Sequence, residues 1–147
     1  MRLDPAEARA LFTSAPVARL ATVRADGAPH VVPVCFAFGG ETIYTAVDHK
    51  PKATAALARL RHIAAEPRVA LLADRYEDDW SQLWWVRVDG EAFIVESAQE
   101  REAALAALGA AYTQYAERPP QGPVIAVRPR RFTGWRASMA CQSRKRP

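Results

Sequence analysis

The residues with the clearest chemical meaning are cations gathered around one predicted helix start. The chain has three lysines, and two of them, Lys50 and Lys52, lie between a predicted strand and a predicted helix. Arg59 and Arg61 follow within that helix. Free N–H groups and the helix dipole make a helix N-terminus attract anions and disfavour cations. A bound phosphate would resolve this conflict, so the segment predicts an anion-binding site, with solvated loop lysines as the alternative.

No acid, base or nucleophile stands in a known catalytic pattern. The sequence has no G-x-S-x-G, H-E-x-x-H, P-loop or G-x-G-x-x-G motif, and its histidines, His30, His49 and His62, are scattered. The two cysteines, Cys35 and Cys141, form neither a disulfide framework nor a metal-ligand spacing. A hydrolase is therefore poorly supported. If the protein is an enzyme, we expect a cofactor to bring the chemistry while the protein binds and orients it.

Turn and capping signals predict the elements that position these cations. Asp4-Pro5 begins a short helix that ends near residue 14. Asp26-Gly27 is a strong hairpin signal, and Pro33 within the second strand indicates a sheet edge or a bulge. Strands are expected at about 17–24, 29–38, 41–47, 68–74, 82–95 and 124–136, and further helices at 52–65 and from 98 to about 116. Six strands with short helices predict an antiparallel β-barrel; the rival interpretation is an open α+β sheet.

Bulk properties describe one globular domain. The chain has 147 residues, 50% hydrophobic and 24% charged, and a net charge of +4. We expect residues 1–137 to form the domain and 138–147 to be a basic tail. No apolar run is long enough to cross a membrane, and no signal-peptide pattern opens the chain, so a cytoplasmic location is expected. Nucleic-acid binding is not expected, because the body supplies no clear basic face with interleaved aromatics.

Three stretches resemble one known family. They are LATVRADGAPHVVPVCFAF, then DHKPKATAALARLRHIAAEPRVALLAD, and finally WWVRVDGEA with RFTGWRA. In order and spacing they resemble the split β-barrel flavin and deazaflavin oxidoreductases named after pyridoxamine-5'-phosphate oxidase. The resemblance implies a six-stranded antiparallel split β-barrel that forms a homodimer, with the coenzyme bound at the subunit interface. A closed two-fold dimer is also the commonest soluble assembly.

The resemblance also implies the residues that bind the coenzyme. The second strand would form the floor of the ring, and the third strand would end beside the ribityl chain. Trp135 and Arg136 would reach a coenzyme bound mainly by the partner subunit. His62 stands where relatives often carry an asparagine. The expected coenzyme-binding residues are His30, Val32, Pro33, Val34, Thr45, Ala46, Val47, Lys50, Lys52, Arg59, Trp135 and Arg136; no catalytic residue or metal ligand is expected.

Two further expectations concern the coenzyme and the tryptophans. FMN has one terminal phosphate, whereas coenzyme F-420 has a phosphodiester and an acidic tail that favour a wider cationic groove. Lys50, Lys52, Arg59, Arg61 and Arg75 are the cations available for such a groove, so F-420 is preferred and FMN is the alternative. A non-catalytic flavin- or deazaflavin-binding protein also remains open. Trp84 and Trp85 are neighbours on a strand, so one should fill the core and the other an interface.

Overall fold

Seven antiparallel strands and four α-helices make up the described part of the chain. The structure is a computed structural model that describes residues 1–47 and 54–138. The strands are β1 (Ala18–Val23), β2 (Pro29–Val34), β3 (Ala37–Gly39), β4 (Thr42–Ala46), β5 (Arg68–Arg75), β6 (Trp84–Ile94) and β7 (Val124–Arg136). The helices are α1 (Pro5–Ser14), α2 (Thr54–Ala65), α3 (Ala98–Ala111) and α4 (Thr113–Glu117), with a short 3-10 helix, η1 (Trp80–Gln82).

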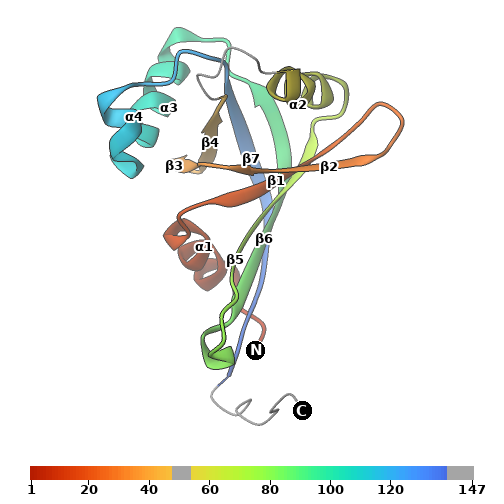
Figure 1. Ribbon diagram of the computed structural model, residues 1–147, viewed down its shortest axis with the longest axis vertical. Coiled ribbons are helices and arrows are strands. Elements are labelled where there is room, and N and C mark those ends of the chain that lie inside the picture. The colour runs from red at the N-terminus through yellow and green to blue at the C-terminus, as the bar shows by residue number, and fades with distance from the viewer. Residues whose placement is uncertain (48–53, 139–147) are drawn as a thin grey trace.

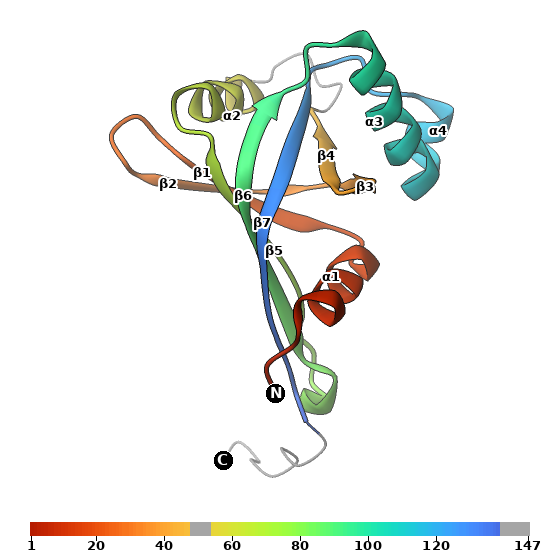
Figure 2. The same cartoon turned by 180° about the vertical axis from the view of Figure 1, so that it is seen from behind.

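The strands form one sheet in the order β2-β1-β5-β6-β7-β4-β3. Figures 1 and 2 show that it is strongly twisted, so that the short β3 and β4 lie near one end of the long β6 and β7 and give a half-barrel. The helix α2 stands at the same end, and α1 lies lower, against β7 and β6. The predicted mainly β, split-barrel fold is confirmed.

The prediction of six strands was wrong by one, because the expected strand 29–38 is divided. β2 ends at Val34 and β3 begins at Ala37, so the chain turns a corner at Cys35 and Phe36. Tyr112 fixes this corner: its hydroxyl lies 2.9 Å from the Phe36 amide nitrogen and 3.0 Å from the carbonyl oxygens of both Phe36 and Pro16. β2 and β3 therefore become the two edges of the sheet, and Pro33 on an edge strand costs no ladder hydrogen bond.

The register between β6 and β7 shifts at Asp89 and Gly90. A Cβ added to Gly90 would lie 2.5 Å from the carbonyl oxygen of Arg128, so only glycine fits there. Pro129 pairs with Gly90 at this irregularity, and β7 runs on through the proline to Arg136. The last expected helix is also divided, because Tyr112 takes an extended conformation between α3 and α4.

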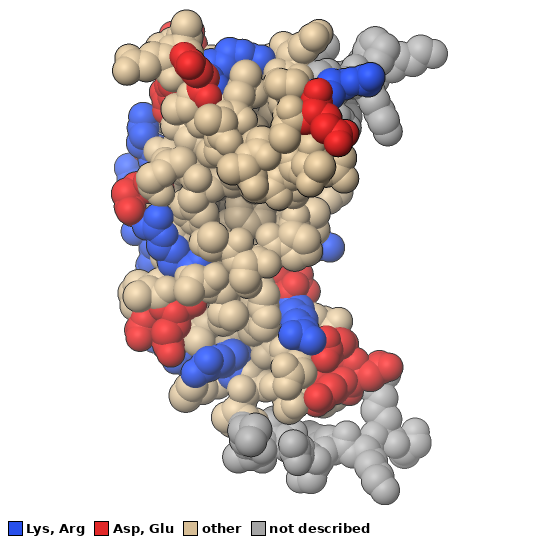
Figure 3. Space-filling model, turned by 90° about the vertical axis from the view of Figure 1, so that its left-hand side faces the viewer, with Lys and Arg blue, Asp and Glu red and all other residues tan. Residues whose placement is uncertain are grey.

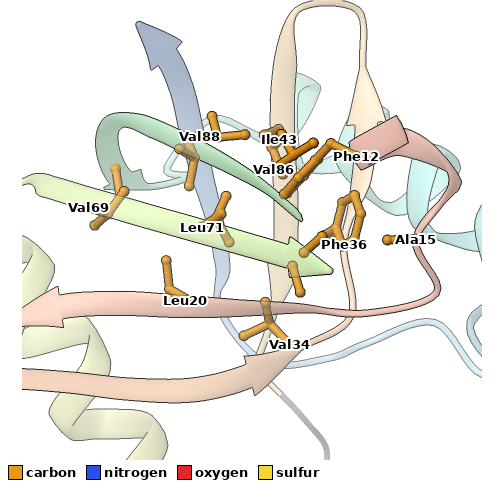
Figure 4. Close-up of a cluster of buried hydrophobic side chains, with 14 of the residues drawn as sticks. Phe12, Ala15, Leu20, Val34, Phe36, Ile43, Val69, Leu71, Val86 and Val88 are labelled. Carbon is orange, nitrogen blue, oxygen red and sulfur yellow. The ribbon is translucent and has the colours of Figure 1, made fainter. Parts of the chain in front are cut away.

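Two apolar clusters hold the elements together. The larger lies between α1 and the inner face of the sheet, where Phe12, Leu20 and Leu71 are fully buried (Figure 4). Trp84 packs against this cluster, as expected for one of the two adjacent tryptophans. The smaller cluster lies under α3 and includes Tyr44, Ala46 and Leu108. None of the helices in the described ranges is long and apolar enough to cross a membrane.

Candidate functional site

The predicted anion-binding segment connects β4 to α2. Lys50 and Lys52 lie outside the described residues, but the elements on either side of them are defined. β4 ends at Ala46 and α2 begins at Thr54, both at the same end of the half-barrel (Figure 1). Ile63 anchors α2 by entering the larger core cluster, and Leu60 packs against it. The segment between β4 and α2 therefore has fixed ends.

Three buried side-chain atoms in the described part of the chain have no hydrogen-bond partner. They are His30 Nδ1, Thr45 Oγ1 and Arg59 Nε. Such atoms are rare in folded proteins, because burying a polar group without a partner costs free energy. All three residues were predicted to bind the coenzyme from the sequence resemblance. They come from β2, β4 and α2, and the last two of these elements lie on either side of the predicted anion-binding segment.

Arg59 is the most informative of the three. It lies one turn before Ile63, so it shares the face of α2 that packs on the sheet. Burial lowers the pKa of its guanidinium, and among the described residues no carboxylate forms an ion pair with it. A partly buried cation without a counter-charge is unfavourable in a folded protein. An anionic group bound here would supply both the charge and the hydrogen-bond acceptor.

His30 belongs to a small polar cluster between α2 and the β1–β2 hairpin. Its ring lies edge-on to His62, with the ring centroids 5.0 Å apart. His62 Nδ1 lies 3.0 Å from Thr22 Oγ1, and Thr22 is the register partner of His30 across β1 and β2. No role was predicted from the sequence for Thr22 or His62. The one sequence signal was at position 62, where relatives often carry an asparagine instead of histidine.

The other predicted floor residues of β2 face in two directions. Val34 is buried in the core cluster, and Val32 packs against that cluster, so both side chains point into the half-barrel. Pro33 points out and is exposed, as is Val31 beside it. A planar ring lying on the outside of β2 would therefore meet Pro33 and the strand's backbone. The side chain of Val34 is buried in the core, so it would not contact such a ring.

The end of β4 offers one polar atom. Ala46 is buried under α3 in the smaller cluster. Val47 is buried as well, and its amide donates to the carbonyl oxygen of Pro123 at 3.0 Å. Thr45 is only 1% exposed and carries the unpartnered hydroxyl. Of these three predicted ribityl contacts, Thr45 has the side chain best suited to a polar ligand.

Trp135 and Arg136 lie at the opposite end of the molecule. Val124 pairs with Ala46 at one end of β7, whereas Trp135 pairs with Trp85 near the other end. At about 3.3 Å per strand residue, roughly 35 Å separate the two ends. Arg75 also lies at the far end and forms an ion pair with Glu77 at 2.7 Å. One chain therefore does not bring Trp135, Arg136 or Arg75 to the site around Arg59.

The outer face of the sheet carries apolar side chains that nothing in the described chain covers. Val31 is 60% exposed and Leu72 is 41% exposed. Both line a hollow of about 560 Å³, together with Trp85. Exposed apolar patches of this kind mark interaction surfaces. Trp85 thus faces away from the core that Trp84 contacts. The residues lining the hollow are Arg19, Ala21, Val31, Ala70, Leu72, Asp74, Trp85 and Arg87.

A second cavity, of about 480 Å³, lies between α1, β3 and α3 and has no charged side chain in its lining. Figure 3 shows the side of the molecule that carries these elements: its central area is uncharged, and charged side chains lie mainly toward the margins. Such a cavity offers no counter-charge to a phosphate. The buried cation without a partner, Arg59, lies at the α2 end instead.

Comparison with known proteins identifies the fold. A family model described as pyridoxamine 5'-phosphate oxidase matches residues 4–136. The solved structure of a conserved hypothetical protein from Mycobacterium tuberculosis superposes with a TM-score of 0.77 at 19% identity, covering 99% of this chain and 92% of that chain. A FAD-binding protein from Mesorhizobium loti gives 0.71 at 21% identity, with 94% and 98% covered.

The heme storage protein HutZ from Vibrio cholerae gives a TM-score of 0.67 at 22% identity, with 90% of this chain and 94% of that chain covered. No curated protein matches significantly. At these identities the likeness to solved structures concerns the fold, and proteins of that fold are named for different ligands.

Proposed function

The chain belongs to the pyridoxamine 5'-phosphate oxidase family, and we propose that it is a homodimeric oxidoreductase that passes hydride between the reduced deazaflavin coenzyme F-420 and a small organic substrate. Two alternatives use the same fold. One is an FMN-dependent oxidase or reductase, and the other is a non-catalytic flavin- or deazaflavin-binding protein. The proposal concerns the site around α2, β2 and the end of β4.

The observation that carries the proposal is the set of three unpartnered buried atoms. Arg59 Nε is a donor with a positive charge, Thr45 Oγ1 donates or accepts, and His30 Nδ1 does either according to its tautomer. A phosphorylated, hydroxyl-bearing coenzyme matches these groups in kind. Arg59 and the segment holding Lys50 and Lys52 would hold the phosphate, and Thr45 would hold a hydroxyl of the ribityl chain.

The distance along β7 supports a site made by two chains. If Trp135 and Arg136 contact the coenzyme, a second copy must supply them, because they lie at the far end of their own chain. The exposed outer face that holds Val31 and Leu72 is a suitable surface for that second copy. A two-fold axis there would place the far end of each chain beside the α2 end of the other. The partner's Arg136 would then add cationic character to the site.

When bound, a reduced deazaflavin supplies a hydride to a substrate held against its face. The chain's own residues bind the coenzyme and orient it; none of them needs to form a covalent bond. Pro33 and the backbone of β2 would support one side of the ring. Positioning of this kind accounts for large rate effects without an acid or base. F-420 is preferred to FMN because its phosphodiester and acidic tail suit a site with several cations.

Measuring turnover distinguishes the proposed oxidoreductase from a non-catalytic binding protein. Purified protein should oxidise reduced F-420 in the presence of an electron-poor acceptor such as a quinone, and Arg59→Met should lower kcat/KM for the coenzyme. Parallel reactions with reduced FMN, and a titration with hemin, test the other ligands found in the fold. Binding of F-420 without turnover by any acceptor would favour the non-catalytic alternative. Binding of hemin alone would overturn the proposal.

A further inference from the structure

His62 joins α2 to the β1–β2 hairpin. It lies in the last turn of α2, and its Nδ1 is 3.0 Å from the hydroxyl oxygen of Thr22 in β1. Its ring also lies edge-on to His30 of β2, at an interplanar angle of 71°. We call these three residues, Thr22, His30 and His62, the histidine joint. Through it the helix contacts both strands of the hairpin.

The surroundings of His62 disfavour a positive charge on its ring. The Thr22 hydroxyl can donate to a neutral Nδ1 or accept from a protonated one, so this hydrogen bond is compatible with either form of the ring. Burial lowers the pKa of His62, and His30 on β2, Arg24 just after β1 and Arg61 on α2 act in the same direction. Asp26 in the hairpin turn acts in the opposite direction.

The position of α2 matters to the candidate site through Arg59. Arg59, with its unpartnered Nε, lies one turn before Ile63, which anchors the helix in the core. A shift of α2 away from the hairpin would therefore move Arg59.

We propose that His62 is a positioning residue whose neutral form holds α2 against the β1–β2 hairpin, so that acidification loosens α2 and the cations it carries. The docking of α2 depends only on contacts within this chain. The expected loss of coenzyme affinity rests in addition on the proposed function.

The stability that the histidine joint contributes should fall as the pH falls, because the pKa of His62 is lowered in the folded state. Above the ordinary histidine pKa of about 6.5, the ring is neutral in the folded and unfolded states, and the contribution of the joint is complete. As pH falls below that value, the unfolded chain takes up the proton first, so stability is lost progressively until the folded-state pKa is passed. The same protonation places a positive charge near Arg24 and Arg61, on a ring whose centroid lies 5.0 Å from that of His30. Docking of α2 should therefore weaken on the acid side of neutrality.

Hydrogen exchange of the protein without coenzyme tests the proposal. Protection of residues 54–65 is measured near pH 7.5 and near pH 5.5, about one unit on either side of the ordinary histidine pKa, after correction for intrinsic exchange rates. The matched variant is His62→Asn, because an asparagine amide places a non-titrating polar atom close to the position of Nδ1. Peptides from the paired core of β6 and β7 serve as the internal reference.

The wild type should lose severalfold protection of α2 at the lower pH, because the pKa of His62 is lowered in the folded state, while the reference peptides stay constant. His62→Asn should remove most of this pH dependence. Equal pH dependence in both proteins, or unchanged protection in the wild type, overturns the proposal. If the variant fails to fold, the NMR titration of the His62 ring decides instead: a midpoint at or above the ordinary value contradicts it.

A titration with F-420 at both pH values separates the two inferences. If α2 loosens as expected and F-420 affinity falls severalfold with it, the histidine joint and the proposed coenzyme site are both supported. If α2 loosens but F-420 binds at neither pH, the proposed function fails and the role of His62 in docking α2 stands. If F-420 binds equally at both pH values while α2 loosens, the coupling to the coenzyme is overturned.

Discussion

Arg59 carries a positive charge that no carboxylate among the described residues pairs with. Its buried Nε has no partner, so its presence should cost stability and benefit only a ligand. We expect Arg59→Met, which keeps length without charge, to raise the free energy of unfolding by about 1 kcal/mol. The same change should weaken coenzyme binding by about ten- to a hundredfold, the effect of losing a charge-assisted contact.

Chemical denaturation and a fluorescence titration measure these two effects. Arg61→Met is the matched control, since Arg61 is exposed on the same helix and should leave both quantities nearly unchanged. Loss of stability in Arg59→Met together with unchanged affinity would show that the arginine serves the fold.

Lys52→Ala, and Lys50→Ala beside it, should also weaken coenzyme binding without unfolding the protein, because loop lysines contribute little to a core.

Thr45 in β4, like Arg59, has a buried polar atom without a hydrogen-bond partner. Thr45→Val keeps the shape and removes the unpartnered hydroxyl, so we expect about 1 kcal/mol of added stability. Coenzyme affinity should fall by about threefold to tenfold if the hydroxyl contacts the ribityl chain. Thr22→Val is the contrast, because the hydroxyl of Thr22 is bonded to His62 and its removal should destabilise. Thermal unfolding of the two variants should therefore shift in opposite directions.

No single side chain should be indispensable as an acid or base. The sequence has no paired nucleophile and base, and the described residues hold no group of three or more metal-ligating side chains. Changes at His30, His49, Tyr44 and Tyr76 should each lower turnover by less than about a thousandfold. Single-turnover kinetics with reduced F-420 measure this. Abolished hydride transfer in one variant, with fold and affinity intact, would identify a true catalytic acid.

The sequence resemblance predicted several residues of the candidate site. It could not predict which of their side chains face the core. Arg59, Thr45 and His30 were expected from the resemblance, and each has an unpartnered buried atom. The same resemblance included Val34 and Ala46, whose side chains fill the core. Strand alternation decides which side chains face in, and the register depends on where β2 ends. That end is set by contacts from Tyr112, far along the chain, which no local pattern reveals.

The corner between β2 and β3 is the element on which the position of β2 depends. Tyr112 holds it from the other side of the smaller cluster, with one hydroxyl near three backbone groups. Burial is the main cause that raises the pKa of this phenol, so the hydroxyl stays protonated at neutral pH. Tyr112→Phe would leave the buried Phe36 amide without its partner, and an orphaned group costs about 1–3 kcal/mol.

Urea unfolding should show a loss of that size for Tyr112→Phe. Tyr76→Phe is the control, since Tyr76 is 64% exposed and should change stability by less than about 0.5 kcal/mol. Equal stability of the two variants would mean that the corner is held by packing alone. A lowered coenzyme affinity in Tyr112→Phe would in addition connect this corner to the candidate site.

Elements whose start and end depend on nearby residues were predicted well. The capping box of Asp4 and Glu7 begins α1 as expected, and the Asp26-Gly27 turn joins β1 to β2. The missing predictions concern divisions inside longer segments, at Cys35-Phe36 and at Tyr112. Both depend on the contact between those two places, which are distant in sequence. Periodicity within a window cannot detect such a contact.

The whole molecule should be a dimer through the outer face of the sheet. Val31 and Leu72 are exposed there beside Trp85, and burying them would favour association. Leu72→Glu should shift the protein to monomer in sedimentation at micromolar concentration and reduce coenzyme binding. Thr13→Glu, an exposed change on α1, is the control. A wild type that sediments only as monomer would contradict the dimer directly.

Mixing two defective chains tests whether the site is shared. If Trp135 serves the partner's coenzyme, dimers of Arg59→Met and dimers of Trp135→Ala should both bind poorly. Co-expressed chains would form heterodimers in which one of the two sites has an intact Arg59 and an intact Trp135. Tagged heterodimers should therefore regain one tight site per dimer. Absence of any tight site would place both residues in the same chain's site, against the length of β7.

The most direct test of the central claim is a fluorescence titration of the purified wild type with F-420 and, separately, with FMN. We expect saturable binding of F-420 with one equivalent per chain, weaker binding of FMN, and a large loss of F-420 affinity in Arg59→Met but not in Arg61→Met. Tighter binding of FMN would make FMN the coenzyme and leave the proposed site unchanged. Failure of both coenzymes to bind, or affinities that do not depend on Arg59, would contradict the proposed function.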